Sequence, residues 1–179
     1  MPTVLTHAVL PLVGVVALSS PPVSRRLVVA AMVAGMLPDA DVVGRAFGIP
    51  HTADLGHRGA THSILFAALA GFIGLTLHRW FDVPRRRAAL VLFLSTLSHP
   101  LTDMLTDGGK GMMLFWPVEH DRFAFLARPV TVSHVGLQDL FSGRIWSVLA
   151  SEAVFLIAPA IVLGLLFHAA RRSFARRPD

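Results

Sequence analysis

Two long stretches of this chain contain no charged side chain, and this feature limits its fold more than any other. Residues 60–78 and 153–170 lack Asp, Glu, Lys and Arg altogether. A helix needs about 20 mainly apolar residues to cross the hydrocarbon of a bilayer. A water-soluble domain would need polar side chains over most of its surface, whereas 54% of these 179 residues are hydrophobic and 15% are charged. The sequence therefore predicts a membrane protein.

The apolar runs predict an all-α fold, a polytopic membrane helical bundle of about five helices that forms one domain over residues 1–179. Prolines at positions 21, 22 and 38 separate the first helices, because proline lacks the N–H that a helix interior needs. No Lys or Arg precedes the first apolar run, so we expect that helix to be retained rather than cleaved as a signal peptide. The helices are expected at residues 3–18, 24–37, 60–80, 88–106 and 147–170.

Basic residues are distributed unevenly between the two sides of this bundle. One side receives ten basic residues and two acids, and the other receives six basic residues and nine acids. The positive-inside rule places the arginine-rich side in the cytoplasm, with the N-terminus outside and the C-terminus cytoplasmic in a bacterial-type inner (plasma) membrane. No aromatic or Gly-rich RNA module accompanies these arginines, so we expect no nucleic acid partner. They are Arg25, Arg26, Arg79, Arg85, Arg86, Arg87, Arg171, Arg172, Arg176 and Arg177.

Histidines and carboxylates gather at the outer ends of four predicted helices. Ionisable groups at membrane depth normally face a polar interior and pair with each other or with an ion. The chain has no cysteine, so any metal must be held by His, Asp or Glu. Mixed His and Asp ligands suit Zn²⁺, and Mn²⁺ or Mg²⁺ fit when carboxylates dominate. The candidate ligands, enough for two ions, are His7, Asp39, Asp41, His57, His62, His99 and Asp103.

Each part of this pattern also has a structural interpretation. His99, Asp103 and Asp107 lie at intervals of four and form one stripe of a helix, but a helix–helix hydrogen bond would use the same spacing. Asp39 and Asp41 on their own are typical of a turn that ends a helix. Glu152 lies within the last predicted helix, where we expect it either to support a metal ligand or to pair with an arginine. We expect exposed loop histidines at 51, 120 and 134, and histidines remote from the cluster at 78 and 168.

The long connection at residues 107–146 supplies further candidates. Its residues 112–116, Met-Met-Leu-Phe-Trp, are expected to lie in the headgroup zone, where Trp is favoured. The Gly-Gly-Lys-Gly run at 108–111 lacks the strand, spacing and Ser or Thr of a P-loop. Substrate-binding residues are expected to be Arg58, Lys110, Trp116 and Arg122.

Taken in order, the motifs resemble the YdjM family, described as LexA-binding inner-membrane metal-dependent hydrolases. They are Thr6-His7, Pro38-Asp39-x-Asp41, His57-Arg58-Gly59-x-Thr61-His62-Ser63, His99-Pro100-x-x-Asp103 and Gly111…Phe115-Trp116-Pro117, over residues 3–130.

That family looks like a membrane relative of the zinc-dependent phospholipase C and P1 nuclease group. The resemblance implies that five residues, His7, Asp39, His62, His99 and Asp103, are metal ligands. The third metal of the soluble group is not expected, because residues 130–179 contain no further His-x-x-x-Glu pair. An outward-facing site would also lie on the wrong side for a cytoplasmic repressor such as LexA, so the protein partner is left unspecified.

Together these features predict a membrane-bound metal-dependent hydrolase that cleaves a phosphoester of a lipid or lipid-linked substrate. The metals would activate water, and Asp39, Asp41 or Asp103 would take its proton. The spacing of these residues does not assign which of them is the base and which is a metal ligand. We expect Asp41 and Arg58 to act in catalysis, with Arg58 and Arg122 on the phosphate oxygens. The alternative is a non-enzymatic membrane protein, either a metal or proton transporter or a protein-interaction partner. A transporter would be expected to carry ionisable residues through the full membrane depth.

Overall fold

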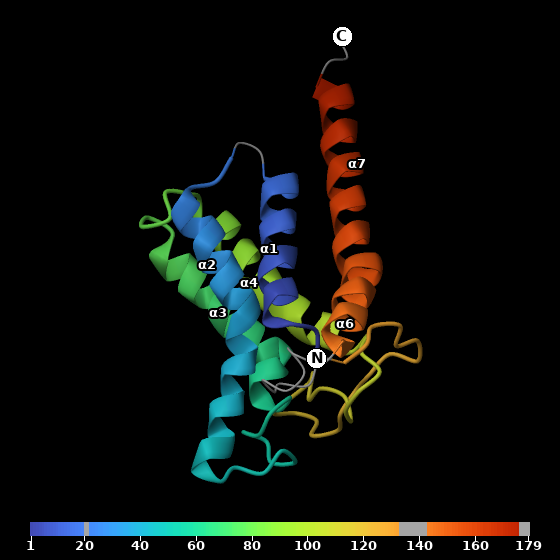
Figure 1. Cartoon of the computed structure of the whole chain (residues 1–179). Coiled ribbons are helices and arrows are strands. Elements are labelled where there is room, and N and C mark those ends of the chain that lie inside the picture. Colours follow the sequence, from blue (N-terminus) through green and yellow to red (C-terminus); the bar gives the residue numbers. More distant parts are fainter. Residues whose placement is uncertain (20–21, 133–142, 176–179) are drawn as a thin grey trace.

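Helices make up all the regular elements in the described part of this computed structural model, residues 1–19, 22–132 and 143–175 (Figure 1). A 3₁₀ helix, η1 (Leu37–Phe47), directly continues the second helix, and a short one, η2 (Ala60–His62), precedes the third. A π-helical turn, η3 (Ala153–Ile157), joins the last two helices into one rod. The all-α prediction is therefore confirmed. The helices are α1 (Val4–Leu18), α2 (Arg25–Met36), α3 (Ile64–Leu77), α4 (Arg85–Asp103), α6 (Arg144–Glu152) and α7 (Ala158–Ala175).

Small residues allow the helices of the bundle to pack closely. One close contact joins α3 and α4, where a Cβ atom added to Gly74 would lie 2.6 Å from the carbonyl oxygen of Ala88. Lipid tails are as apolar as leucine, so helices in a membrane associate through close packing and hydrogen bonds rather than through the hydrophobic effect. The long α6–α7 rod stands beside α1, against the outside of the bundle (Figure 1).

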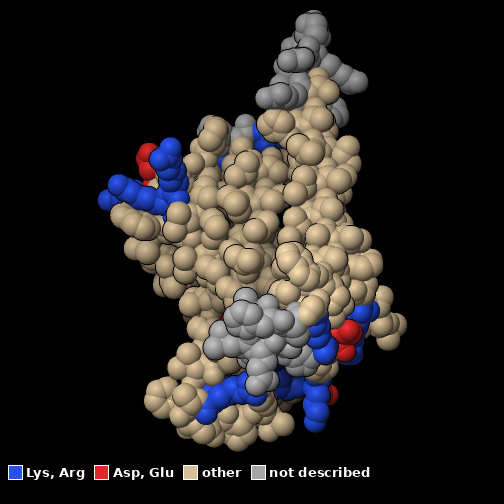
Figure 2. Space-filling model, in the orientation of Figure 1, with Lys and Arg blue, Asp and Glu red and all other residues tan. Residues whose placement is uncertain are grey.

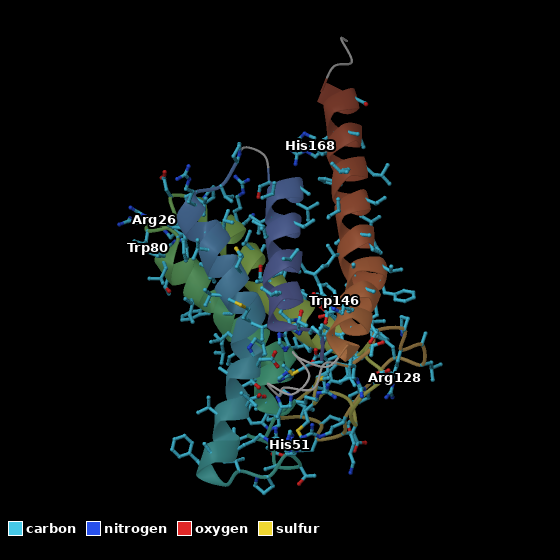
Figure 3. All side chains as sticks on the ribbon, in the orientation of Figure 1. Arg26, His51, Trp80, Arg128, Trp146 and His168 are labelled. Atoms are coloured by element: carbon cyan, nitrogen blue, oxygen red, sulfur yellow. The ribbon has the colours of Figure 1, made fainter. Side chains whose placement is uncertain are left out.

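An uncharged band crosses the middle of one face of the molecule (Figure 2). Two helical stretches, Arg25–Phe47 and Arg144–Arg171, are long and apolar enough to cross a membrane. On the face shown in Figure 2, charged side chains gather at the two ends and leave the middle free of them. Trp80 and Trp146 are exposed at opposite ends of the band (Figure 3), the positions at which tryptophan favours a membrane interface.

Three contacts show that the arginine-rich segments share one end of the molecule. The Arg26 side chain donates a hydrogen bond to the carbonyl of Trp80 over 3.1 Å and stacks on its ring, which joins the start of α2 to the turn after α3. Arg171, near the end of α7, donates to the carbonyl of Leu18 at the end of α1. The N-terminus and the two long connections lie at the opposite end (Figure 1). Arg176, Arg177 and Asp179 lie outside the described residues.

The connection after α4 departs from the expected pattern at two places. Met112, Met113 and Leu114 are buried, and Met112 and Leu114 pack with Met104 in a small core, whereas Phe115 is 47% exposed, so only the end of this segment is free to contact headgroups. Asp107 leaves the predicted stripe because α4 ends at Asp103, and the Asp107 carboxylate instead accepts a hydrogen bond from the backbone of residue 132. His134 lies outside the described residues.

Gly35 is the point at which α1, α2 and α4 meet. A Cβ atom at this position would lie 2.4 Å from the carbonyl oxygen of His7 and 2.6 Å from the ring of Pro11, both in α1. The carbonyl oxygen of Gly35 also accepts a hydrogen bond of 2.7 Å from Nδ1 of His99 in α4. Glycine is therefore required here for the approach of α1 to α2.

We expect Gly35→Ala to lower the free energy of unfolding by about 1–3 kcal/mol, because the added methyl group overpacks the contact with His7 and Pro11. Thermal unfolding of the detergent-solubilised protein measures the change. Gly14→Ala is the matched control, since a Cβ atom in that α1 position meets nothing within 4 Å. An equal effect of the two substitutions would contradict this account of the helix contact.

Candidate metal centre

Five buried side chains meet at the end of the bundle opposite Arg26 and Arg171. They come from four segments: α1, η1, η2 and α4. In the described residues, seven buried side-chain nitrogen or oxygen atoms have no hydrogen-bond partner, and all seven belong to this group. A buried polar atom without a partner costs free energy, so this concentration indicates a place for an ion. The atoms are Nε2 of His7, His62 and His99 and both carboxylate oxygens of Asp39 and Asp103.

The distances within this group suit a small divalent ion. Nε2 of His99 lies 3.3 Å from Asp39 Oδ1, and Nε2 of His7 lies 3.3 Å from Asp103 Oδ1. Nε2 of His62 lies 3.9 Å from Asp39 and 3.8 Å from Asp103. Donor atoms about 2.0–2.1 Å from a tetrahedral Zn²⁺ are roughly 3.3–3.4 Å from one another. The set therefore needs only a small contraction to surround such an ion.

The second nitrogen of each ligand ring is already occupied. Nδ1 of His99 donates to the Gly35 carbonyl, and Nδ1 of His7 lies 3.4 Å from the hydroxyl oxygen of Thr102. Nδ1 of His62 lies 3.2 Å from Asp41 Oδ2. Outer hydrogen bonds of this kind fix the tautomer and orient a metal-binding histidine. His62 and His99 therefore keep Nε2 free in a group with Asp39 and Asp103 whose candidate ligand atoms all lie within 4.8 Å of one another, and Nε2 of His7 adjoins this group through Asp103.

The change from α to 3₁₀ helix after α2 explains why the Gly35 carbonyl is available to His99. In a 3₁₀ helix the partner of this carbonyl would be the N–H of Pro38, which proline does not have. The same change carries Asp39 into the cluster one residue later. Pro38 thus contributes to two features of the centre, the orientation of His99 and the placement of Asp39.

Asp41 lies beside this cluster with both carboxylate oxygens engaged. Oδ1 accepts a hydrogen bond of 2.7 Å from Nδ1 of His57. Oδ2 accepts from the backbone N–H of Arg58 and from the Thr61 hydroxyl, and it also lies next to His62 Nδ1. Asp41 therefore orients two histidines. Asp41, His57 and His62 still form a second group whose candidate ligand atoms lie within 4.8 Å of one another.

Arg58 reaches the cluster through an unusual backbone conformation. Its φ of 68° lies in the left-handed region, which a residue with a side chain adopts only when its surroundings enforce it. Its Nε lies 3.9 Å from Asp103 Oδ2, and its Nη1 donates to the Gly108 carbonyl. A Cβ atom on Gly109 would lie 1.6 Å from Nη1. Gly109, which is not part of a P-loop, therefore makes room for this guanidinium.

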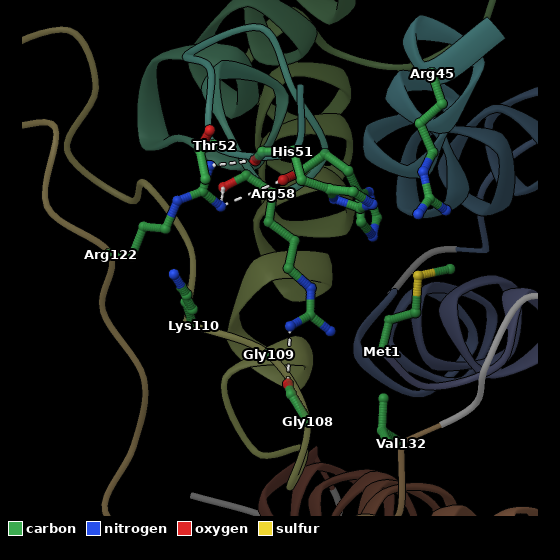
Figure 4. Close-up of a pocket in the computed structure, with 11 residues that line it drawn as sticks. Met1, Arg45, His51, Thr52, Arg58, Gly108, Gly109, Lys110, Arg122 and Val132 are labelled. Carbon is green, nitrogen blue, oxygen red and sulfur yellow. Dashed lines mark hydrogen bonds between the residues drawn. The ribbon is translucent and has the colours of Figure 1, made fainter. Parts of the chain in front are cut away.

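A cavity of about 500 Å³ opens beside Arg58, and positive charge dominates its walls (Figure 4). Besides Arg58, the cationic residues that line it are Arg45, Lys110 and Arg122. Partial burial and the nearby Arg45 lower the pKa of His51, another wall residue, as expected in a positive environment. Among the described residues, no Asp or Glu lines the cavity. The cavity therefore suits an anionic ligand.

Comparison with known proteins identifies the family. The model of the family described as YdjM inner membrane protein matches residues 1–175. The chain belongs to the YdjM family. It is 38% identical to the inner membrane protein YbcI of Escherichia coli over 172 residues, which cover 93% of this chain and 98% of YbcI. No solved structure matches it.

A shorter match links this YdjM-family protein to the inner membrane protein YdjM of Escherichia coli. The two are 43% identical over 70 residues, which cover 38% of this chain and 34% of YdjM. The names of both relatives place them in the inner membrane, in agreement with the two helical stretches that can cross a bilayer. Neither name states an activity.

The structure separates the remaining candidate residues by position. Arg122 lines the cavity, but its guanidinium donates to the carbonyls of His51, His57 and Arg58 and so holds this loop together. Trp116 is not among the residues that line the cavity, and its Nε1 donates to Asp54. Sequence reasoning had not singled out Arg45, Thr102 or the cavity position of His51. Thr102 lies inside the His99-Pro100-x-x-Asp103 motif, and this position is the sequence feature that indicates a role for it in the cluster.

Glu152 joins the C-terminal rod to the first turn of α1. Its carboxylate is fully buried and accepts hydrogen bonds from the backbone N–H of Thr3 and from the hydroxyl groups of Thr3 and Thr6. Within residues 1–19, 22–132 and 143–175, no ion pair joins it to an arginine. Because Thr6 precedes His7, this contact fixes the segment that carries the first candidate ligand.

We expect the wild-type protein to bind a divalent metal ion. Asp103→Ala and His99→Ala should each lose most of this metal, since each substitution removes candidate ligand atoms of the cluster. Metal content per chain after purification, measured by atomic emission, provides the test. His78→Ala is the matched control, because that histidine lies at the arginine-rich end, where its Nδ1 bonds the Val83 carbonyl. Unchanged metal content in both cluster variants would eliminate the site.

Proposed function

We propose that this protein is a membrane-bound metal-dependent hydrolase that acts on a phosphoester of a lipid or lipid-linked substrate. The observation that carries the proposal is the group of seven partnerless buried atoms, which adjoins a cavity lined by cations. A divalent ion held there would polarise a phosphoryl oxygen and activate water at neutral pH. Three imidazoles and two carboxylates favour Zn²⁺ over Mn²⁺ or Mg²⁺.

The geometry of Asp39, His62, His99 and Asp103 supports a site for one ion, with His7 beside it, and a second ion stays a prediction. A second ion would require the group of Asp41, His57 and His62. In that group the 2.7 Å hydrogen bond between Asp41 and His57 already uses the atoms that would bind it. The metal content of the wild-type protein therefore distinguishes one ion per chain from two.

His57 is the residue that we assign to proton transfer. Its Nδ1 is bound to Asp41, so Nε2 is the nitrogen left for the cavity that this histidine lines. The ring centroid of His57 lies 5.6 Å from that of His62, one of the candidate ligands. A carboxylate that orients an imidazole in this way prepares it as a general base. Asp41 then acts through His57 instead of taking the proton itself.

Arg58 completes the arrangement by binding the phosphoryl group. Its Nε lies near Asp103 and its side chain lines the cavity, so it connects the cluster with the space that a substrate would occupy. Guanidinium groups bind phosphate oxygens in a bidentate manner. The cluster lies at one end of the uncharged band, so a tail can stay in the bilayer while the phosphate reaches the cavity.

A transporter is less well supported by the distribution of charge. Every buried ionisable side chain of the described residues lies at the end that holds the cluster. The buried polar side chains of α4 toward the arginine-rich end, Ser95 and Thr96, do not ionise. A proton or metal path would need such groups through the depth of the membrane.

Hydrolysis assays test the enzymatic proposal. We expect the zinc-loaded protein in detergent to hydrolyse an amphiphilic phosphoester faster than a soluble ester with the same leaving group, and a chelator to abolish both activities. His57→Gln should lower kcat by roughly 10²- to 10⁴-fold with metal content unchanged, since general acid–base catalysis contributes about that much. His120→Gln is the control, because His120 forms a similar pair with Asp54 but is exposed.

Two outcomes would count against these assignments. Equal rates for the amphiphilic and the soluble ester would remove the lipid part of the proposal. A lack of chelator-sensitive hydrolysis across a broad panel of esters would favour a non-enzymatic role.

We further propose that the arginine-rich end faces the cytoplasm and the metal centre faces outward, as the positive-inside rule implies. A reporter that works only in the cytoplasm should then be active when fused after Asp179, and one that works only in the periplasm should be silent there. The reverse result would place the cluster inside, where a cytoplasmic partner could reach it.

A further inference from the structure

Two cationic side chains in the cavity wall form no hydrogen bond or ion pair within the described structure. Arg45 and Lys110 line the cavity, and among the described residues neither side chain has a hydrogen-bond or ion-pair partner. In Figure 4 their side chains stand on opposite sides of the Arg58 guanidinium. Both residues are exposed, so they are hydrated while the cavity is empty and would gain a partner only when an anion enters.

One phosphate group would leave these two cations unused. A phosphoryl group at the metal centre would be held by the ion, whose charge the carboxylates of Asp39 and Asp103 offset, and by the guanidinium of Arg58. Arg122, the fourth cation of the cavity, donates to three backbone carbonyls and is committed to the loop. The remaining positive charge of Arg45 and Lys110 therefore matches a second anionic group. The volume of about 500 Å³ is in the range of sites for small molecules and exceeds what one phosphate fills.

From this arrangement we infer that the substrate is a diphosphate ester, with one phosphoryl group at the metal centre and the other in the cavity that Arg45 and Lys110 line. This inference rests on the proposed function and names its substrate class. A diphosphate fits because the Arg58 guanidinium adjoins both Asp103 and this cavity, and adjacent phosphoryl groups share one bridging oxygen. Arg45 and Lys110 are then residues that determine specificity.

The reaction follows from the chemistry of such an ester. The oxygen of water forms a bond to the phosphorus at the metal centre, and the bond from that phosphorus to the bridging oxygen breaks. The bridging oxygen leaves with the other phosphoryl group, which Arg45 and Lys110 hold. His57 takes a proton from the attacking water and returns it to a phosphate oxygen of the products. The products are one orthophosphate and one phosphomonoester, and no oxidant or further reactant is needed.

Ligand binding tests this inference independently of turnover. We would titrate the zinc-loaded protein in detergent with methylenediphosphonate, which cannot be hydrolysed at its bridge, and with orthophosphate. The wild type should bind the diphosphonate at least about tenfold more tightly, a difference of about 1.4 kcal/mol. The double variant Arg45→Gln/Lys110→Gln should reduce this preference to near one, and Arg144→Gln, which removes an exposed arginine outside the cavity, should retain it.

Hydrolysis of farnesyl diphosphate and farnesyl phosphate gives the second measurement. We expect kcat/KM for the diphosphate to exceed that for the monophosphate at least about tenfold, with the advantage lost in the double variant. Equal binding of the two anions, or a preference that the double variant keeps, would overturn the inference while metal-dependent hydrolysis of monoesters stands. A preference that depends on Arg45 and Lys110, without hydrolysis of either ester, would support the anion site and refute the proposed function.

Discussion

The two buried carboxylates of Asp39 and Asp103, which face three imidazole nitrogens without partners, are the constraint on which the rest of the structure depends. Two uncompensated negative charges away from water are costly, and only an ion or protonation relieves the cost. The five side chains come from four segments, so the same requirement holds one end of the bundle together. In lipid, where apolar packing gives little preference between helices, this polar requirement specifies which helix ends must meet.

Three prolines adjoin this cluster, and each removes one backbone N–H from a helical segment that carries a candidate ligand. Pro11 follows His7 by four residues, so it leaves the His7 carbonyl without its helical partner, beside Gly35. Pro38 frees the Gly35 carbonyl and precedes Asp39, and Pro100 follows His99 within α4. Irregular backbone at membrane depth is tolerated only where it is buried in protein or lines a cavity. The prolines and the polar cluster are therefore linked, because backbone carbonyls left without helical partners are placed where the protein interior surrounds them.

Opposite charges lie next to each other at this end of the molecule. The cluster carries the negative charge of two carboxylates, whereas four cations line the neighbouring cavity. Arg58 belongs to both, and its left-handed backbone and the space at Gly109 are the structural means by which it reaches them. A divalent ion in the cluster would cancel its negative charge, after which the whole region attracts anions. Metal binding and anion binding are thus coupled in the proposed mechanism.

The sequence by itself determined where the helices lie, because hydropathy and proline positions are local properties. It also indicated which side chains meet, because the histidines and aspartates stand at helix ends on one side of the bundle and His99 and Asp103 have helical spacing. Only the tertiary structure decided how each atom is used. Spacing places a residue on a face, but whether Asp41 binds an ion or orients His57 depends on hydrogen bonds from segments far apart in the chain. The burial of Met112 and the cavity position of Arg45 depend likewise on how two connections fold against each other, which no helical period encodes.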